Sequence, residues 1–201
     1  STIQIHDATI DAHTIGGGSL ALRGCSVGIS NSQLQWTPKA LYSGHQNSTT
    51  AGSVATALLT FDAQQDSSVT ITNTNSYLDN PFVASGFAPS SADSLALNRH
   101  DLINFIATAA RSNISIDAGT HTIRQRVPGD ASLIRLSPRT PTDGGVAVVS
   151  FPHVVVSGAT IAMESSSTHA NHRSVVSIPS PSGADQVVTG GRVVVSSNDV
   201  T

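Results

Sequence analysis

The chain has 201 residues, which is enough for one domain, or two small ones, with a substantial buried core. Its formal net charge is −3 and 11% of its residues are charged, so the charge balance calls neither for nucleic acid nor for an acidic membrane surface. No apolar stretch is long enough to span a bilayer, and no signal peptide is visible at the start. The single cysteine, Cys25, excludes an intrachain disulfide, and we interpret it as a small buried thiol.

The composition favours strands and turns over helices. The chain holds one lysine and one glutamate against nine arginines and twelve aspartates, so strong helix formers are scarce. Serine, threonine, valine and isoleucine are plentiful, and the β-branched residues among them favour strands.

One short pattern returns along the chain: apolar, any, apolar, any, small polar, any, any, apolar. Random order would give roughly one full match. The pattern is complete in Ile3–Ile10, Leu20–Val27, Val27–Leu34, Val154–Ile161 and Val193–Val200, and Val69–Ser76 lacks only its last position. A repeated strand–turn–strand unit is typical of a solenoid, because each unit buries its apolar edge only against the next one.

The first half of the chain is predicted to form coils of such a solenoid. Residues 1–36 are expected to be short strands, and the polar, aperiodic residues 37–53 a surface loop. Strands resume at Leu58–Phe61 and Val69–Ile71. Residues 1–82 are therefore assigned to β-helix coils.

A linker and one helix are predicted next. Gly86, Pro89 and a serine run indicate a linker over residues 83–97. Asn98 can cap a helix, and Asp101 stands near its positive end. The apolar stripe of this helix consists of Leu102, Ile106, Ala109 and Ala110, with Ser112 and Asn113 at its end.

After the helix, strands alternate with polar loops, so residues 98–201 hold the capping helix and further coils, and the whole chain is expected to be one continuous solenoid domain. Loops are predicted over 137–145 and 164–174, and strands over 146–161 and 175–200. The alternative is a β-sandwich or jelly roll, but no Asn-Gly or Asp-Gly dipeptide lies neatly between two alternating strands. We therefore predict an all-β fold, a right-handed parallel β-helix with one short capping α-helix.

One stretch resembles the right-handed parallel β-helix proteins of the pectate-lyase-like group, which includes phage tailspikes, polysaccharide lyases and glycoside hydrolases. Two short motifs follow the predicted helix and carry the resemblance. The first matches at Ile114, Ile116, Gly119, Thr120 and Ile123, with His121 in the usual aromatic place and Asp117 departing from the usual proline; the second matches at Val154, Val156, Gly158 and Ile161. The resemblance covers about two-thirds of the chain and is specific for fold rather than function.

The order of the elements differs from that family, in which the cap comes first, because some 97 residues precede the predicted helix here. Two arrangements account for this: a circularly permuted solenoid, or coils that belong at both ends to a longer or assembled helix. Termini on adjacent coils would support permutation, and termini at opposite ends of the solenoid would contradict it.

The carboxylates that could carry catalysis are Asp7, Asp11, Asp62 and Asp66. No G-x-S-x-G, H-E-x-x-H, P-loop or C-x-x-C motif is present, and one lysine makes a lysine-based lyase a poor fit. Glycoside hydrolysis needs two carboxyl groups, which Asp7 with Asp11 or Asp62 with Asp66 could supply. The alternative is that each is a turn-forming aspartate. Glu164 is a weaker candidate for a general acid.

Aromatic and imidazole groups are the candidates for substrate binding. Trp36, Tyr42 and Tyr77 lie in or beside loops that flank strands, where rings could stack on sugars or pack a loop onto the coils. His6 and His13 are further candidates, although their spacing is not that of a recognised zinc site, so no metal and no cofactor is expected.

The family resemblance implies recognition of an extended polysaccharide in a surface groove, with or without hydrolytic cleavage. The alternative is a non-catalytic structural or adhesion module of spike or capsid type. By the same resemblance we expect an extracellular or virion-surface protein that forms a homo-oligomer, for which a trimer is one form.

Overall fold

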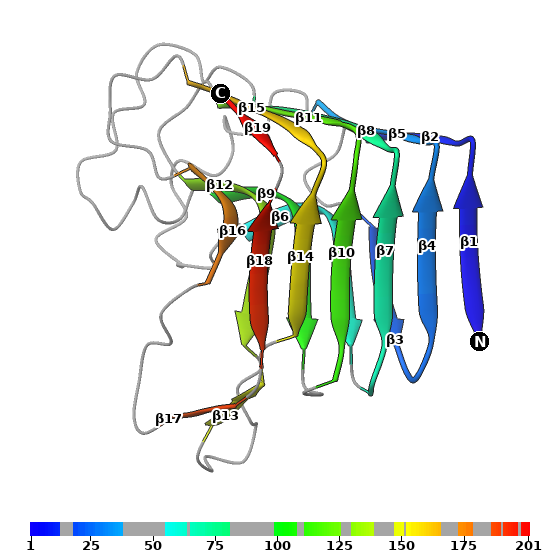
Figure 1. The fold of residues 1–201 in the computed structure, drawn as a ribbon, viewed down its shortest axis with the longest axis vertical. Helices are drawn as coiled ribbons and strands as arrows, with labels where there is room; N and C mark the ends of the chain where they lie inside the picture. Colours follow the sequence, from blue (N-terminus) through cyan, green and yellow to red (C-terminus); the bar gives the residue numbers. More distant parts are fainter. Residues whose placement is uncertain are drawn as a thin grey trace, which may run out of the picture.

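The computed structural model describes residues 1–12, 18–37, 55–63, 65–80, 99–107, 111–125, 130–138, 147–150, 152–165, 173–178, 186–189, 191–196 and 198–201. Within these ranges the chain forms strands and no helix. The strands make three parallel sheets, here named A, B and C, and one additional two-stranded pair (Figure 1).

The strands follow each other in a fixed rotation through the three sheets. Sheet A consists of β1 (Thr2–His6), β4 (Ser26–Ser30), β7 (Ser68–Thr72), β10 (Asn113–Asp117), β14 (His153–Ser157) and β18 (Arg192–Ser196). Sheet B consists of β2 (Thr9–Ala12), β5 (Gln33–Trp36), β8 (Asn75–Asn80), β11 (Thr120–Gln125), β15 (Thr160–Ser165) and β19 (Asp199–Val200). Sheet C consists of β3 (Gly18–Leu22), β6 (Ala55–Ala63), β9 (Arg99–Ala107), β12 (Asp130–Pro138) and β16 (Arg173–Ser177). The separate two-stranded pair consists of β13 (Ala147–Ser150) and β17 (Gln186–Thr189).

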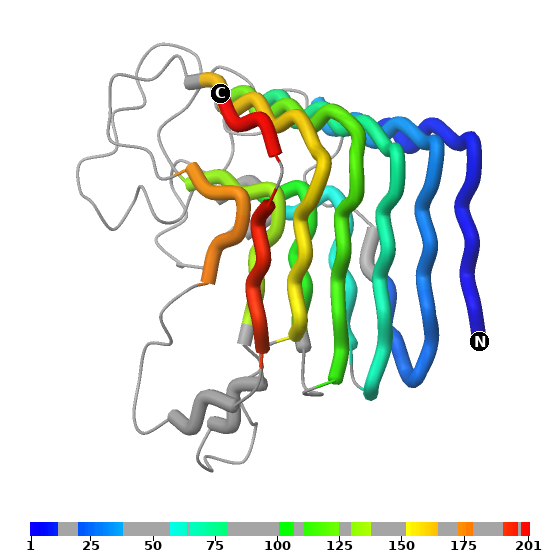
Figure 2. The backbone as a smooth tube through the Cα atoms, in the orientation of Figure 1, coloured from blue at the N-terminus to red at the C-terminus, as the bar shows by residue number. Residues whose placement is uncertain are grey.

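Each turn of the chain thus adds one parallel strand to sheet A, then one to sheet B and one to sheet C. This arrangement is a parallel β-helix, so the predicted solenoid is confirmed at this level. The tube in Figure 2 shows successive coils stacked side by side along one axis.

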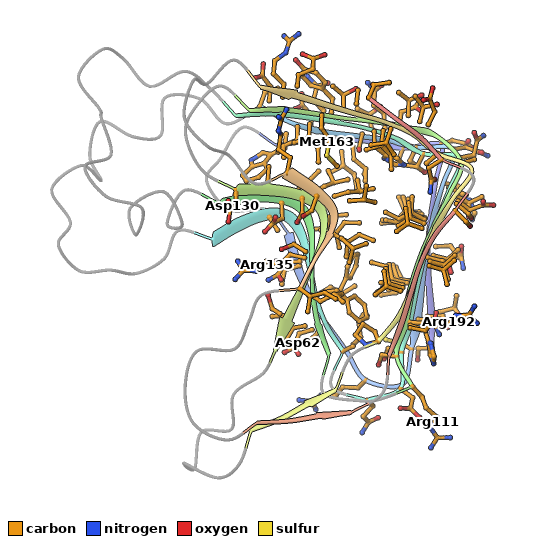
Figure 3. All side chains as sticks on the ribbon, turned by 60° about the vertical axis from the view of Figure 1, so that its left-hand side comes forward. Asp62, Arg111, Asp130, Arg135, Met163 and Arg192 are labelled. Carbon is orange, nitrogen blue, oxygen red and sulfur yellow. The ribbon has the colours of Figure 1, made fainter. Side chains whose placement is uncertain are left out.

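The apolar pattern becomes two inward rows on sheet A. Val27, Val69 and Ile114 pair in register on neighbouring strands, and so do the next inward residues, including Ile29 and Ile71. These five side chains are at most 2% exposed. Because successive side chains of a strand point to opposite faces, the residues between them face outward. The aliphatic side chains fill the space between the sheets (Figure 3).

The pattern marks one structural unit, with one exception. The matches at Ile3–Ile10, Val27–Leu34, Val154–Ile161 and Val193–Val200 each run from a sheet A strand through a tight turn into a sheet B strand. The match at Leu20–Val27 spans the end of β3 and the start of β4 instead, so its apolar residues belong to sheets C and A.

The small polar position of the pattern is a left-handed turn residue. Asp7, Asn31, Asn73 and Ala118 have φ between 46° and 60°, and Gly158 has φ 63°. Aspartate, asparagine and glycine reach this conformation more easily than other residues. Asn73 Nδ2 donates a hydrogen bond to Asn31 Oδ1 at 3.0 Å. The two asparagine side chains therefore form a ladder from one turn to the next, on the exposed side of the coil.

The predicted capping helix is wrong. Residues 99–107 form β9, which lies in sheet C between β6 and β12. The helical stripe used Leu102 and Ile106, but the strand also buries Ile103 and Phe105 completely. Phe105 pairs in register with Phe61 of β6, so packing between coils overrides the helical spacing.

The termini lie at opposite ends of the solenoid. Strands β1 and β18 are the two edges of sheet A, and Figure 1 marks N and C at opposite sides of the stack. The circular permutation is therefore contradicted, and coils of a longer or assembled helix stay as the other prediction. The predicted linker, residues 83–97, lies outside the described residues.

Candidate functional site

The residues predicted to bind substrate do not gather in one place. His6 ends β1 on the outer face of sheet A, and Tyr77 lies half-buried on the outer face of sheet B. Trp36 is an inward residue of β5 with 0% exposure, so the prediction that it stacks on a sugar is wrong; it packs the core instead. Tyr42 and His13 lie outside the described residues.

The four predicted catalytic aspartates lie on four different elements. Asp7 occupies the left-handed turn after β1, and its backbone N–H donates to the Ser30 carbonyl oxygen at 3.2 Å. Asp11 lies on β2, Asp62 on β6, and Asp66 in the turn before β7. Asp7 and Asp66 thus lie beyond opposite ends of the sheet A strands.

Asp66 forms an ion pair with a turn of the next coil. Its Oδ2 lies 3.1 Å from Arg111 Nε, and both side chains are largely exposed. An exposed pair of this kind contributes little to stability. The pair links two stacked turns, so Asp66 fits the alternative of a turn-forming aspartate.

Asp62 lies on the outer side of sheet C, as does Arg135 (Figure 3). One coil beyond β6, the Asp101 side chain is nearly fully buried and accepts a hydrogen bond from Ser132 Oγ at 2.5 Å. Arg135 Nη1 lies 4.0 Å from Asp101 Oδ2. A buried carboxylate is tolerated only when it is paired and hydrogen-bonded. Ser132 and Arg135 therefore stabilise the Asp101 carboxylate within sheet C.

A polar face extends across sheet B in two adjacent rows. Asp11, Gln35, Tyr77 and Thr122 pair in register on β2, β5, β8 and β11, which makes the first row. Their chain neighbours, such as Leu78, point into the core, so the row itself faces outward. The structure therefore places two of the predicted residues, Asp11 and Tyr77, in the same row.

The second row consists of Asp79, Arg124 and Glu164 on consecutive strands. Arg124 Nε donates to Glu164 Oε2 at 2.6 Å, and Tyr77 Oη donates to Asp79 Oδ2 at 3.3 Å. The hydrogen bond to Glu164 and the nearby Tyr77 raise the pKa of the Arg124 guanidinium, so it stays charged. Charged donors and acceptors thus flank the tyrosine ring.

Sequence reasoning missed Asp79 and Arg124, and gave Glu164 only a minor role. Each follows the inward residue of a sheet B strand, namely Leu78, Ile123 and Met163. The available signal was a shared position, three residues after the last position of the repeating unit, but the residues lie 45 and 40 positions apart along the chain.

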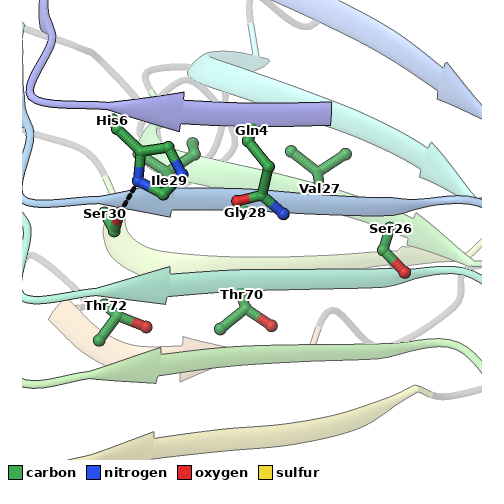
Figure 4. A pocket seen from close by; sticks show the side chains of 9 residues that line it. All are labelled: Gln4, His6, Ser26, Val27, Gly28, Ile29, Ser30, Thr70 and Thr72. Atoms are coloured by element: carbon green, nitrogen blue, oxygen red, sulfur yellow. Dashed lines mark hydrogen bonds between the residues drawn. The ribbon is translucent and has the colours of Figure 1, made fainter. Parts of the chain in front are cut away.

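A shallow depression lies on the outer face of sheet A, at β1, β4 and β7 (Figure 4). Its volume is about 220 Å³. It is lined by Gln4, His6, Ser26, Val27, Gly28, Ile29, Ser30, Thr70 and Thr72. His6 Nδ1 and Ser30 Oγ are hydrogen-bonded, which fixes the imidazole above the strand.

A histidine lies in the core of sheet B. His121 is 0% exposed, and its Nδ1 lies 2.8 Å from Ser76 Oγ. Burial lowers the pKa of His121 to about 4, although a backbone hydrogen bond at Ala118 partly opposes the shift. The imidazole is therefore neutral at pH 7, and its burial keeps it out of reach of a polymer.

Comparison of the chain with protein-family models, with curated proteins and with solved structures found no match. In the part of the chain that the structure describes, no cluster of three or more histidine, cysteine, aspartate or glutamate side chains could hold a metal ion. The same residues include no helix long and apolar enough to cross a membrane.

Proposed function

We propose that the chain recognises an extended polysaccharide along the outer face of sheet B, outside the cell or on a virion surface. The observation that carries this proposal is the tyrosine ring of Tyr77 between in-register hydrogen-bonding groups on the neighbouring coils. The resemblance of the sequence to carbohydrate-active β-helix proteins supports the same ligand class.

The chemistry of the two rows suits a sugar. A pyranose has an apolar face and a polar rim, so an aromatic ring covers its face while nearby polar groups bind its hydroxyls. Asp79 and Glu164 offer acceptors and Arg124 offers donors, all within the row next to Tyr77. Gln35 and Thr122 extend the polar groups on either side of the ring.

The geometry of the solenoid suits a polymer. Neighbouring strands lie about 4.8 Å apart, so a chain running across them meets a new set of side chains at each coil. Recognition is the form that these rows support directly, because Tyr77 and its in-register neighbours supply a ring and hydrogen-bonding groups.

The first test is binding of a panel of polysaccharides by affinity electrophoresis, with Tyr77→Ala and Arg124→Gln as variants. Both side chains face outward, so the variants should keep the wild-type melting temperature and lose retardation on the bound polymer. Ser115→Ala, an outward change on sheet A, is the matched control and should bind normally. Normal binding by both sheet B variants would contradict the proposal.

The same panel tests cleavage. New reducing ends without an ultraviolet-absorbing unsaturated product would indicate hydrolysis, and Asp→Asn changes at positions 7, 11, 62 and 66 would then locate the catalytic pair. Reducing ends together with the unsaturated product would indicate a lyase. Absence of binding and cleavage on every polymer would favour the structural or adhesion module instead.

A further inference from the structure

The depression on sheet A owes its shape to one glycine. Gly28 occupies an outward row that continues with Gln4 on β1, Thr70 on β7 and Ser115 on β10. Only this position of the row lacks a side chain among these four strands. Gly28 lies between His6 and Ser30 on one side and Ser26 on the other, and the amide of Gln4 lies over it (Figure 4).

The backbone does not require glycine at position 28. Its φ is not among the positive values of the described glycines, so no left-handed conformation is involved. The three atoms nearest to a Cβ placed there all belong to the amide of Gln4, which is the far end of a flexible side chain and would have to move aside. A glycine inside a strand weakens the strand, and often marks a place where a ligand approaches the backbone closely.

The lining has the chemistry of a neutral, polar site. Hydroxyl groups come from Ser26, Ser30, Thr70 and Thr72, an amide from Gln4 and an imidazole from His6. Among the described residues no carboxylate, ammonium or guanidinium group lines the depression, so a charged ligand would lose hydration without gaining a counter-charge. Hydroxyl and amide groups both donate and accept, as sugar hydroxyls do.

The volume of the depression and the fixed imidazole of His6 restrict the range of ligands further. A volume of about 220 Å³ is below the roughly 300–1,000 Å³ of pockets for drug-sized ligands, so it suits one small unit. The hydrogen bond between His6 Nδ1 and Ser30 Oγ orients the ring. Nε2 of His6 has no partner among the described residues and is available to a ligand hydroxyl.

We propose that this depression binds one uncharged, polyhydroxylated unit, such as a single neutral glycosyl residue. The inference rests on the proposed function in one respect, that the ligand is a carbohydrate. The site itself is separate, because its residues lie on sheet A and not on sheet B. It implies that the protein holds a sugar through hydroxyl and amide groups here and through an aromatic ring on sheet B.

The test follows the His6 ring resonances by NMR during titration with neutral methyl glycosides of glucose, galactose, mannose, xylose and N-acetylglucosamine. At least one glycoside should shift these resonances in a saturable way, and methyl glucuronide should bind at least tenfold more weakly. Absence of a shift with every neutral glycoside, or equal binding of the uronide, would overturn the inference.

Gly28→Thr is the decisive variant, because the new side chain, which the next strand carries at Thr70, displaces the Gln4 amide and covers the floor of the depression. A β-branched residue favours the strand more than glycine does, so the melting temperature should not fall. Binding of the neutral glycoside should weaken at least tenfold. Ser115→Thr adds a methyl group in the same row outside the depression and should bind as the wild type does.

The two proposals fail in different ways. Loss of polymer binding in Tyr77→Ala, with no response of His6 to any glycoside, would leave the proposed function standing and overturn the sheet A site. A glycoside response that Gly28→Thr abolishes, with polymer binding unchanged in Tyr77→Ala, would keep the sheet A site and contradict the sheet B proposal.

Discussion

The buried histidine of sheet B predicts that the fold weakens in mild acid. His121 lies in the inward row between Ser76 on β8 and Ile161 on β15, with no exposure to solvent. Burial lowers its pKa to about 4, whereas an unfolded chain has a histidine pKa of 6.5. Below pH 6.5 the unfolded state therefore binds a proton that the folded state excludes.

The sign and size of the effect follow from this difference. The fold carries no penalty from His121 above pH 6.5, loses stability as the pH falls through the window from 6.5 to 4, and loses no more below it. A difference of about 2.5 pKa units, at about 1.36 kcal/mol each, corresponds to a loss of about 3 kcal/mol. At pH 5 the loss should already be about 2 kcal/mol.

The assay is urea unfolding at a series of pH values, in the wild type and in the double variant Ser76→Ala/His121→Leu. The double change removes the titrating group without leaving the Ser76 hydroxyl buried and unpaired, so its cost at pH 7 should be small. The other histidines cancel in the comparison. The stability difference between the two proteins should shift by about 3 kcal/mol in favour of the variant between pH 7 and pH 4. Parallel pH profiles would refute the reasoning.

Three further predictions concern stability and are measured by urea unfolding at pH 7. Gly119→Ala should destabilise by more than about 2 kcal/mol, because φ is +95° and the new Cβ would collide with the Thr74 carbonyl oxygen; an unchanged midpoint would contradict this turn. Ala118→Asn should stabilise by about 0.5–1 kcal/mol, since asparagine tolerates the left-handed conformation and extends the amide ladder; no gain would show that the ladder stops earlier. Ser132→Ala should cost about 1.5–3 kcal/mol by removing a hydrogen bond to the buried Asp101 carboxylate, and a loss below about 0.5 kcal/mol would refute that role.

The sequence predicted the unit that joins sheets A and B because this unit is nearly constant. Val27 and Ile29 point inward, Asn31 makes the left-handed turn, and Leu34 points inward again on β5. Two residues separate the strands at this turn, so the spacing of the apolar residues stays the same in every coil. A constant spacing is what a pattern search detects.

Strand β9 of sheet C escaped prediction because its buried residues do not alternate with exposed ones. Asp101, Leu102 and Ile103 are consecutive and all are buried, at 1%, 1% and 0% exposure. In the register of β9 with β6, Leu102 falls between the paired residues on either side of it. This interruption breaks the alternation by two, and the remaining apolar spacing of Leu102 and Ile106 imitates a helix.

The candidate site was predictable only in part, because it depends on register between distant coils. Tyr77 was recognised as a surface aromatic residue, but Trp36, which looked equivalent, occupies an inward position of β5. Asp79, Arg124 and Glu164 become neighbours only through the pairing of β8, β11 and β15. No local motif links them, so sequence alone offered no reason to group them.

The same register explains why function can be separated from stability in this fold. Inward rows bury aliphatic side chains and determine how the coils stack, so changes there act on folding. Outward rows are repeated at the strand spacing but touch only solvent or each other, so they can vary freely. Gly28 is informative for this reason: an outward glycine weakens its strand, is not demanded by its backbone, and sits among groups that could bind a sugar. Its replacement by threonine should therefore stabilise the strand and weaken binding of the glycoside. A substitution that only disturbs packing cannot produce both effects.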